Sequence, residues 1–142
     1  MSHSGGCQCG AVRYRIAELG RATICHCRMC QKAFGGFFGP LVTAKGIAWT
    51  RGSPTCFASS NKVKRGFCAQ CGTPLSYDWG GDLEISIGSL DNPEAAAPVL
   101  QVNPADRLSF FGSLHALSVR KNPDAVSDFM ADIVNHQHPD HD

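Results

Sequence analysis

The sequence predicts a mainly β domain, built as an antiparallel meander or small double sheet and followed by one C-terminal amphipathic helix. The length of 142 residues is typical of one domain, which we place at residues 1–142. The 15 glycines and 8 prolines favour a turn-rich chain over a helical bundle. Several short segments alternate apolar and polar residues, which is the period of a strand with one buried face.

The first predicted strand follows the first pair of cysteines, where Val12, Tyr14 and Ile16 alternate with two arginines. Further short segments are bounded by Gly, Pro, Ser or Asn, which are the residues that favour turns. These predicted strands are residues 36–43, 47–50, 55–59, 63–68, 74–79 and 83–87. A connection rich in Asp, Asn and Pro then covers 91–106, and residues 108–119 are the candidate for a last strand.

A C-terminal helix is predicted over residues 123–135. Asn122 offers an N-cap, and Pro123 and Asp124 offer a proline and an acid at the helix start. Apolar residues follow at helical spacing, namely Val126, Phe129, Met130, Ile133 and Val134. We expect this apolar face to pack on the sheet. The last residues, 136–142, contain three histidines and are predicted to form a disordered tail.

The composition excludes a membrane protein and weakens a nucleic-acid-binding role. No apolar run reaches the ~18 residues that a bilayer-spanning helix needs. Residues 1–77 carry ten Lys and Arg against one acid, and a basic half can indicate a nucleic-acid partner. All eight cysteines lie in the same half, however, and metal sites built from their thiolates would offset part of that charge. Nucleic acid is therefore not the expected partner.

The cysteines are expected to bind metal in a reducing cytoplasm. The first six residues lack the apolar stretch of a secretion signal, and the cysteine content is below that of small disulfide-rich secreted domains. Because thiol pools keep unmetallated cysteine pairs reduced in the cytoplasm, clustered cysteines there indicate metal ligands before disulfides.

Seven of the eight cysteines fall into three clusters. These are Cys7-Gln-Cys9-Gly10, Cys25-His-Cys27-Arg-Met-Cys30 and Cys68-Ala-Gln-Cys71-Gly72. The last has the C-x-x-C-G pattern of a zinc knuckle, in which two sulfurs bind one ion at about 2.3 Å. Two cysteine pairs brought together from distant parts of the chain would complete a closed structural site. The middle cluster could hold an ion with three thiolates from a single loop and leave its fourth position open, as in catalytic zinc sites.

A distant side chain could instead close that fourth position. The candidates are Cys56, His26, His115 and Asp78. His26 stands between two proposed ligands, so we expect its ring to point away from the metal. Cys56 lies in an apolar strand segment, where we expect it to be buried in the core.

Four segments carry a wider pattern. Residues 6–10 are G-C-Q-C-G, residues 25–35 are C-H-C-R-M-C-Q-K-A-F-G, residues 65–72 are R-G-F-C-A-Q-C-G and residues 88–93 are G-S-L-D-N-P. Their order and spacing resemble the glutathione-dependent formaldehyde-activating family, which includes the domain of centromere protein V, and the resemblance covers roughly residues 5–115.

The resemblance implies a zinc-stapled antiparallel double sheet with two zinc ions per chain. It implies that four cysteines, hereafter the quartet, hold a structural zinc: Cys7, Cys9, Cys68 and Cys71. It further implies that three cysteines, hereafter the trio, hold a catalytic zinc that exchanges more readily: Cys25, Cys27 and Cys30.

The activity implied by the resemblance is the addition of glutathione to formaldehyde, or its reversal, which is a carbon–sulfur lyase reaction. The expected partners are a small-molecule electrophile and a thiol, with glutathione as the family's thiol. Because three thiolates exceed the charge of zinc by one, capture of an incoming thiolate is favoured over strong carbonyl activation. Arg28 or Lys32 could neutralise that excess charge.

A substrate pocket is expected beside the trio, walled by aromatic residues such as Phe34, Phe37, Phe38 or Trp79. The alternative function is a non-enzymatic zinc-ribbon interaction module, whose second metal site would be closed or empty.

Overall fold

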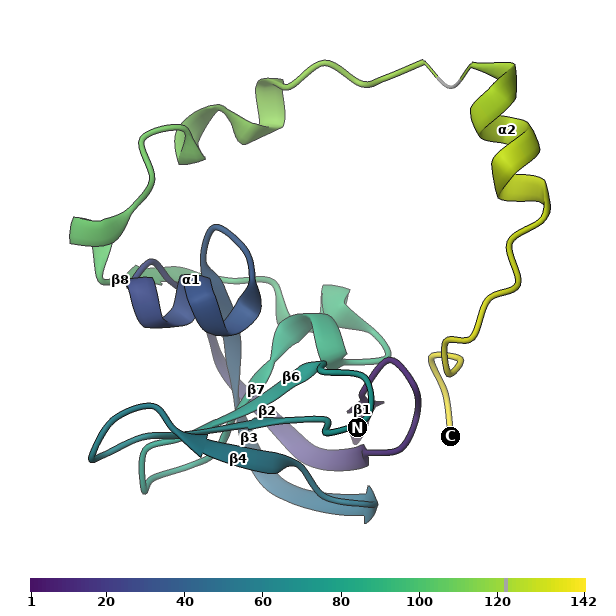
Figure 1. The fold of residues 1–142 in the computed structure, drawn as a ribbon. Coiled ribbons are helices and arrows are strands. Elements are labelled where there is room, and N and C mark those ends of the chain that lie inside the picture. Colours follow the sequence, from purple (N-terminus) through teal and green to yellow (C-terminus); the bar gives the residue numbers. More distant parts are fainter. Residues whose placement is uncertain (122) are drawn as a thin grey trace.

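The fold is one curved sheet with a few short helices (Figure 1). The computed structural model describes residues 1–121 and 123–142. Its strands are β1 (His3–Gly6), β2 (Arg13–Cys25), β3 (Gly39–Arg51), β4 (Thr55–Ala58), β5 (Lys64–Phe67), β6 (Pro74–Asp78), β7 (Glu84–Ser86) and β8 (Leu100–Val102). The α-helices are α1 (Arg28–Phe34) and α2 (Asp124–Ala131), and the 3-10 turns are η1 (Ile87–Ser89), η2 (Pro93–Ala96), η3 (Pro104–Asp106) and η4 (Phe111–Ala116). The mainly β class is confirmed.

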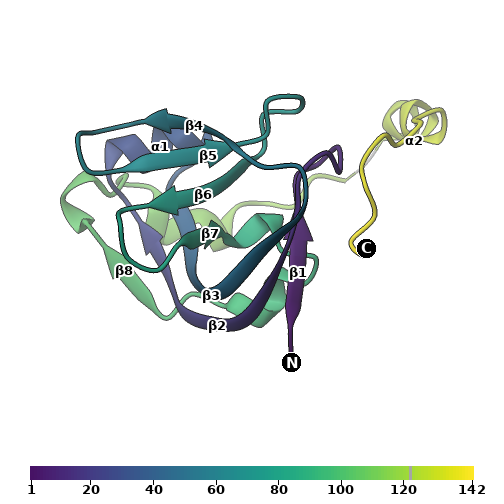
Figure 2. The ribbon, with the colours of Figure 1, turned by 90° about the horizontal axis from the view of Figure 1, so that it is seen from below.

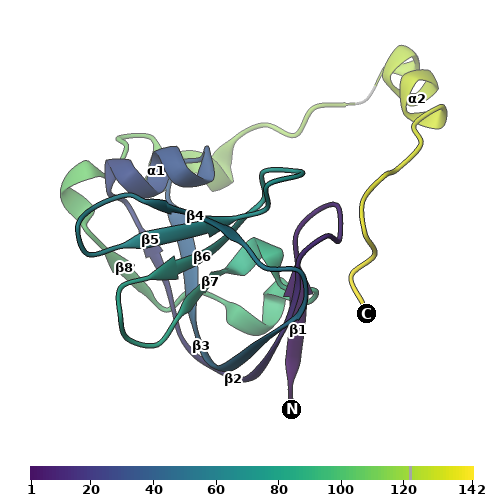
Figure 3. The same cartoon turned by 60° about the horizontal axis from the view of Figure 1, so that its bottom comes forward.

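The described strands join in the order β1-β2-β3-β7-β6-β5-β4, and every neighbouring pair in this order is antiparallel. The eighth, β8, pairs with the end of β2 in the parallel direction. Figures 2 and 3 show that the sheet curves from β4 round to β2, so one continuous sheet stands where a double sheet was expected. β3 also unites two predicted strands across Gly46, whose φ of 64° suits glycine.

The buried core is built in part on β2. Tyr14 and Ile16 are fully buried, as their alternation with arginines predicts. The Tyr14 hydroxyl is 2.7 Å from the Ser89 hydroxyl, so the first long strand is tied to η1. Cys7 and Cys68 belong to the same buried cluster, which places half of the quartet in the core.

Residues 108–119 do not form the predicted last strand. Phe111–Ala116 is the 3-10 turn η4, and the last strand is β8, inside the predicted connection. Two adjacent aromatic residues explain the difference, since Phe110 contacts Phe37 at a ring distance of 5.1 Å and Phe111 contacts Phe38 at 5.7 Å. In a strand these neighbours would point to opposite faces.

The helices also depart from prediction. α1 begins directly after Cys27, in a segment that was expected to be a loop. α2 confirms the predicted C-terminal helix but is shorter than 123–135, and its apolar face does not pack on the sheet, because the helix lies apart from it (Figure 1). Phe129 is 70% exposed and Met130 57% exposed. The predicted N-cap, Asn122, lies outside the described residues.

The C-terminal tail returns to the first strands. The His138 backbone N–H donates to the Gln8 carbonyl at 2.8 Å, and the Asp142 carboxylate lies 2.9 Å from Arg13 and 2.6 Å from Arg15. These contacts hold the tail against the first strands, whereas a disordered tail was expected. Within the described chain, neither α-helix combines the length and the apolar character needed to cross a bilayer.

Candidate metal centres

The quartet joins two loops that lie far apart in the sequence. Its four sulfur atoms all lie within 4.8 Å of one another. Cys7 and Cys9 come from the β1–β2 loop, with their sulfurs 3.6 Å apart, and the sulfur of Cys68 in the β5–β6 loop lies 3.8 Å from that of Cys9. Each cysteine pair is followed by a glycine with positive φ, which allows the tight turn. Four sulfurs gathered in this way fit the tetrahedral ligand set of zinc.

Hydrogen bonds direct the loops around these sulfurs. The N–H groups of Val12 and Gln70 donate to the sulfurs of Cys7 and Cys68, at 3.2 and 3.4 Å. The hydroxyl of Thr73 lies 3.2 Å from the sulfur of Cys71. The hydrogen-bond donors to the sulfurs of the quartet are therefore backbone amides and a hydroxyl.

The thiols of the quartet do not ionise alike in the absence of a cation. Although burial raises the pKa of Cys71, hydrogen bonds from Thr73 and Cys9 outweigh it and hold that pKa at about 6. The backbone of Ala11 lowers the pKa of Cys9, but burial and hydrogen bonds to the neighbouring thiols raise it to about 12. A thiolate at Cys71 beside a protonated Cys9 is an arrangement that a bound divalent cation relieves.

The trio is assembled at the junction of β2 and α1. Cys25 is the last residue of β2, Cys27 caps α1 and Cys30 lies in the first turn of that helix, and the three sulfurs lie within 4.8 Å of one another. The α1 helix, which sequence reasoning missed, is what turns Cys30 toward the other two. The local fold thus brings three candidate ligands to one point.

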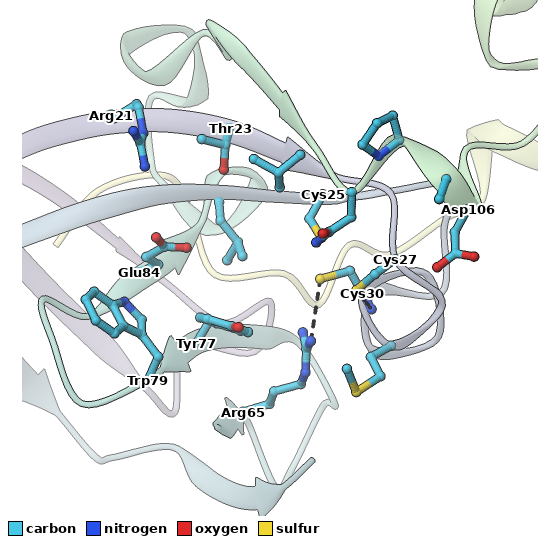
Figure 4. A pocket seen from close by; sticks show the side chains of 16 residues that line it. Arg21, Thr23, Cys25, Cys27, Cys30, Arg65, Tyr77, Trp79, Glu84 and Asp106 are labelled. Carbon is cyan, nitrogen blue, oxygen red and sulfur yellow. Dashed lines mark hydrogen bonds between the residues drawn. The ribbon is translucent and has the colours of Figure 1, made fainter. Parts of the chain in front are cut away.

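Each sulfur of the trio accepts a hydrogen bond from a donor other than the neighbouring thiols. The Asn103 side-chain amide donates to Cys25 at 3.2 Å, and the Cys30 backbone N–H donates to Cys27 at 3.3 Å. The Arg65 guanidinium donates to Cys30 at 3.5 Å, as Figure 4 shows. Donors aimed at every sulfur are the environment that stabilises thiolates, which are the form that binds metal.

The sulfurs at the ends of the trio differ in acidity. Burial raises the pKa of Cys25, but the hydrogen bond from Asn103 and those from the other thiols lower it overall. For Cys30, burial is the larger effect and raises the pKa to about 12 against the lowering influence of Arg65. A bound cation would have to displace this proton from Cys30.

None of the four candidates for a fourth ligand joins the trio. Within the described chain, the group of His, Cys, Asp and Glu ligand atoms at this point contains the three cysteines alone. His26 is fully buried elsewhere, with Nε2 2.8 Å from the Gln101 side-chain oxygen and its ring against Phe111. Cys56 is exposed on the edge strand β4, so the expected core burial is wrong.

The trio opens onto a cavity of about 750 Å³ (Figure 4). Arg21, Tyr77 and Glu84 lie across the cavity from the cysteines, and residues 102–106 form another wall. Among the predicted aromatic walls, Trp79 lines the cavity. Phe34, Phe37 and Phe38 do not line it.

Two side chains that contact the sulfurs were missed or left without a role at the sequence level. Arg65 is 8% exposed and contacts Cys30, whereas Arg28 binds the Gln31 side chain. The position of Arg65 inside the 65–72 motif was the signal that the sequence offered. Asn103 lies in the Pro- and Asn-rich connection, where nothing in the sequence distinguishes it from ordinary turn residues.

Comparison with known proteins agrees with this geometry. A family model described as "Glutathione-dependent formaldehyde-activating enzyme" matches residues 2–105, which include both cysteine groups. A crystal structure of a Rhodobacter sphaeroides protein, a structural genomics target, is similar in fold, with a TM-score of 0.54 and 22% sequence identity. The similarity covers 70% of this chain and 99% of that one. The chain thus belongs to the glutathione-dependent formaldehyde-activating enzyme family.

Proposed function

We propose that this protein is a zinc-dependent enzyme of the carbon–sulfur lyase type. It forms or breaks the adduct between a thiol and a small electrophile, in the manner of S-hydroxymethylglutathione synthesis. The observation that supports this most is the trio itself, because three sulfurs with one donor each border a cavity without a fourth ligand from the described chain. Family membership supports the thiol as partner.

The two sulfur groups have separate roles in this proposal. The quartet, partly buried in the core, holds a structural zinc, and the trio holds a catalytic zinc. When bound at the trio, zinc would supply a Lewis acid and a position for a sulfur ligand. All eight cysteines are free thiols in the structure, and we place the protein in a reducing cytoplasm, where such ligands stay reduced.

The reaction forms one bond between the thiol sulfur and the electrophilic carbon. For an aldehyde, the carbonyl oxygen gains the electron pair of the C=O bond and takes the proton that the thiol loses. Two carboxylates line the cavity, those of Glu84 and Asp106. Burial raises the pKa of Glu84 despite the opposing charge of Arg21, so we assign the transfer of that proton to the Glu84 carboxylate.

The cavity walls contribute by positioning the reactants and excluding water. Tyr77 and Trp79 give one wall an aromatic surface, which can hold a small electrophile close to the sulfurs. Arg65 and Asn103 keep the sulfurs in place through their hydrogen bonds.

The proposal is tested by combining metal analysis with an adduct assay. We expect two zinc ions per chain, of which one exchanges readily and responds to added glutathione. We also expect the protein to accelerate exchange between glutathione plus formaldehyde and their adduct, followed by NMR. Cys27→Ser should abolish the acceleration and lose one zinc.

Cys56→Ser is the matched control, because Cys56 is exposed and outside both sulfur groups. It should keep both zinc ions and full activity. A single tightly held zinc with no acceleration would contradict the proposal and support the interaction module instead.

A further inference from the structure

We infer that Arg65 is a positioning residue that sets the charge preference of the open position at the trio. Its guanidinium acts as the fixed counter-cation that allows this position to accept an anionic sulfur ligand. The inference rests on the proposed function and adds to it the residue that selects the charge of the incoming group.

The guanidinium of Arg65 is held from three sides. Its Nε donates to the Ser59 hydroxyl at 3.2 Å, and its Nη2 donates to the sulfur of Cys30 at 3.5 Å. The cation also lies over the ring of Tyr77, 4.9 Å from the ring centre. Arg65 and Tyr77 are paired across β5 and β6, so the sheet register itself brings cation and ring together. The planar group is therefore fixed before any ligand arrives.

The buried charge of Arg65 has no carboxylate partner among the described residues. Their ion pairs join Arg13 and Arg15 to aspartates and Lys45 to Glu18. A guanidinium stays protonated in proteins, and burying a charge without a counter-charge is costly. Glu84 and Asp106 line the same cavity without forming an ion pair with Arg65. The sulfurs of the trio are thus the candidates for its counter-charge.

Charge balance then explains the position of Arg65. Three thiolates with a divalent cation carry one excess negative charge, which the arginine cancels. A fourth, anionic sulfur would bring the total to one negative charge with Arg65 present and to two without it. The other charges that line the cavity are one cation, Arg21, and the carboxylates of Glu84 and Asp106, which do not supply a net positive charge. Arg65 is therefore the group on which binding of an anion should depend.

The test compares a charged and a neutral ligand of the same position. Cobalt(II) replaces the exchangeable metal, and binding of 2-mercaptoethanol, as thiolate, and of imidazole is followed by visible absorption. For Arg65→Met we expect thiolate affinity to fall by about 10- to 100-fold, the range for loss of groups that contact metal ligands. Imidazole affinity should change far less. A residue with only a structural role would move both affinities together.

Three further variants separate charge from hydrogen bonding and from folding. Arg65→Gln keeps a donor but removes the charge, so it should lose thiolate binding selectively, and it replaces the Met variant if that fails to fold. Arg65→Lys keeps the charge and should retain the preference for thiolate. Lys64→Met removes an exposed cation from the neighbouring position of β5 and should have no effect.

Equal losses for both ligands, or no loss in either neutral variant, would overturn the inference. If the unaltered protein binds 2-mercaptoethanol at its cobalt site, the open position of the proposed function stands whatever the Arg65 variants do. If it binds neither probe, the proposed function fails, and the role of Arg65 fails with it.

Discussion

At the scale of single residues, Asn103 combines an unusual backbone with a chemical contact. It is the one described non-glycine residue with positive φ, at 53°, and its side-chain amide donates to Cys25. Asparagine tolerates this conformation better than most residues, so strain is modest. The left-handed backbone between β8 and η3 places the amide at the sulfur. The left-handed backbone of Asn103 is therefore what allows its side chain to contact the trio.

Asn103→Asp should weaken metal retention at the trio. Aspartate also accepts the left-handed backbone, but it replaces the donor to Cys25 with a negative charge facing a thiolate. We expect the affinity of the trio for zinc to fall by about 10- to 100-fold, measured by competition with a chelator. Asn61→Asp, at an exposed turn, is the control and should leave zinc affinity unchanged. Equal zinc affinity in the two variants would show that the amide does not support the site.

At the scale of elements, a buried ion pair ties the first two strands to the connection after η1. Arg13 of β2 binds both oxygens of Asp91, at 2.8 and 2.7 Å, and the Ser4 hydroxyl of β1 donates to Asp91 at 2.6 Å. The side chains of Arg13 and Asp91 are 3% and 11% exposed. This arrangement fixes the end of the sheet from which the quartet's first loop emerges.

Asp91→Asn should lower the free energy of unfolding by about 3 kcal/mol, because it leaves a buried arginine without its main counter-charge. Chemical denaturation measures the loss. Glu18→Gln removes an ion pair of similar length at the surface, where solvent screens it, and should have little effect. Similar denaturation midpoints for the two variants would show that the buried pair stabilises the fold no more than the surface pair.

The same pair predicts a loss of stability in acid. Burial raises the pKa of Asp91, but the hydrogen bonds from Arg13 and Ser4 lower it below its ordinary value. A carboxyl with a lowered folded-state pKa stabilises the fold above its unfolded pKa of about 3.9, and this stabilisation is lost as pH falls through the folded value. Unfolding curves below about pH 4 should therefore show a steeper decline for the unaltered protein than for Asp91→Asn. Parallel declines would mean that other carboxyls dominate.

The elements also show which features of the fold and the site could be predicted from the sequence. Tyr14 and Ile16 could be placed in the core, since strict alternation is a local pattern. The three cysteine clusters could be found for the same reason, because their spacing is local, whereas the joining of two of them into the quartet was implied only by the family resemblance. The contact of Arg65 with Cys30 and the pairing of β8 with β2 could not be predicted, because both depend on contacts between distant segments, although the 65–72 motif already singled out Arg65.

At the scale of the whole molecule, the two sulfur groups differ in how much chain they enclose. The quartet connects residues 7–9 with residues 68–71, so a metal there closes a loop that contains the four strands β2, β3, β4 and β5. The trio spans residues 25–30 only, and its sulfurs lie at the edge of a cavity. Metal at the quartet should therefore contribute far more to folding than metal at the trio.

Cys68→Ser should prevent soluble folding, whereas Cys27→Ser should leave a folded protein. Cys68 is buried in the core cluster, so its loss removes a metal ligand and puts a hydroxyl in an apolar site, while Cys27 is half-buried beside the cavity. Circular dichroism, thermal melting and soluble yield of both variants measure the difference, and a strong chelator should reproduce the Cys68 effect in the unaltered protein. Unfolding of both variants to the same extent would show that the trio is structural as well, and the separation of roles between the two sulfur groups would fail.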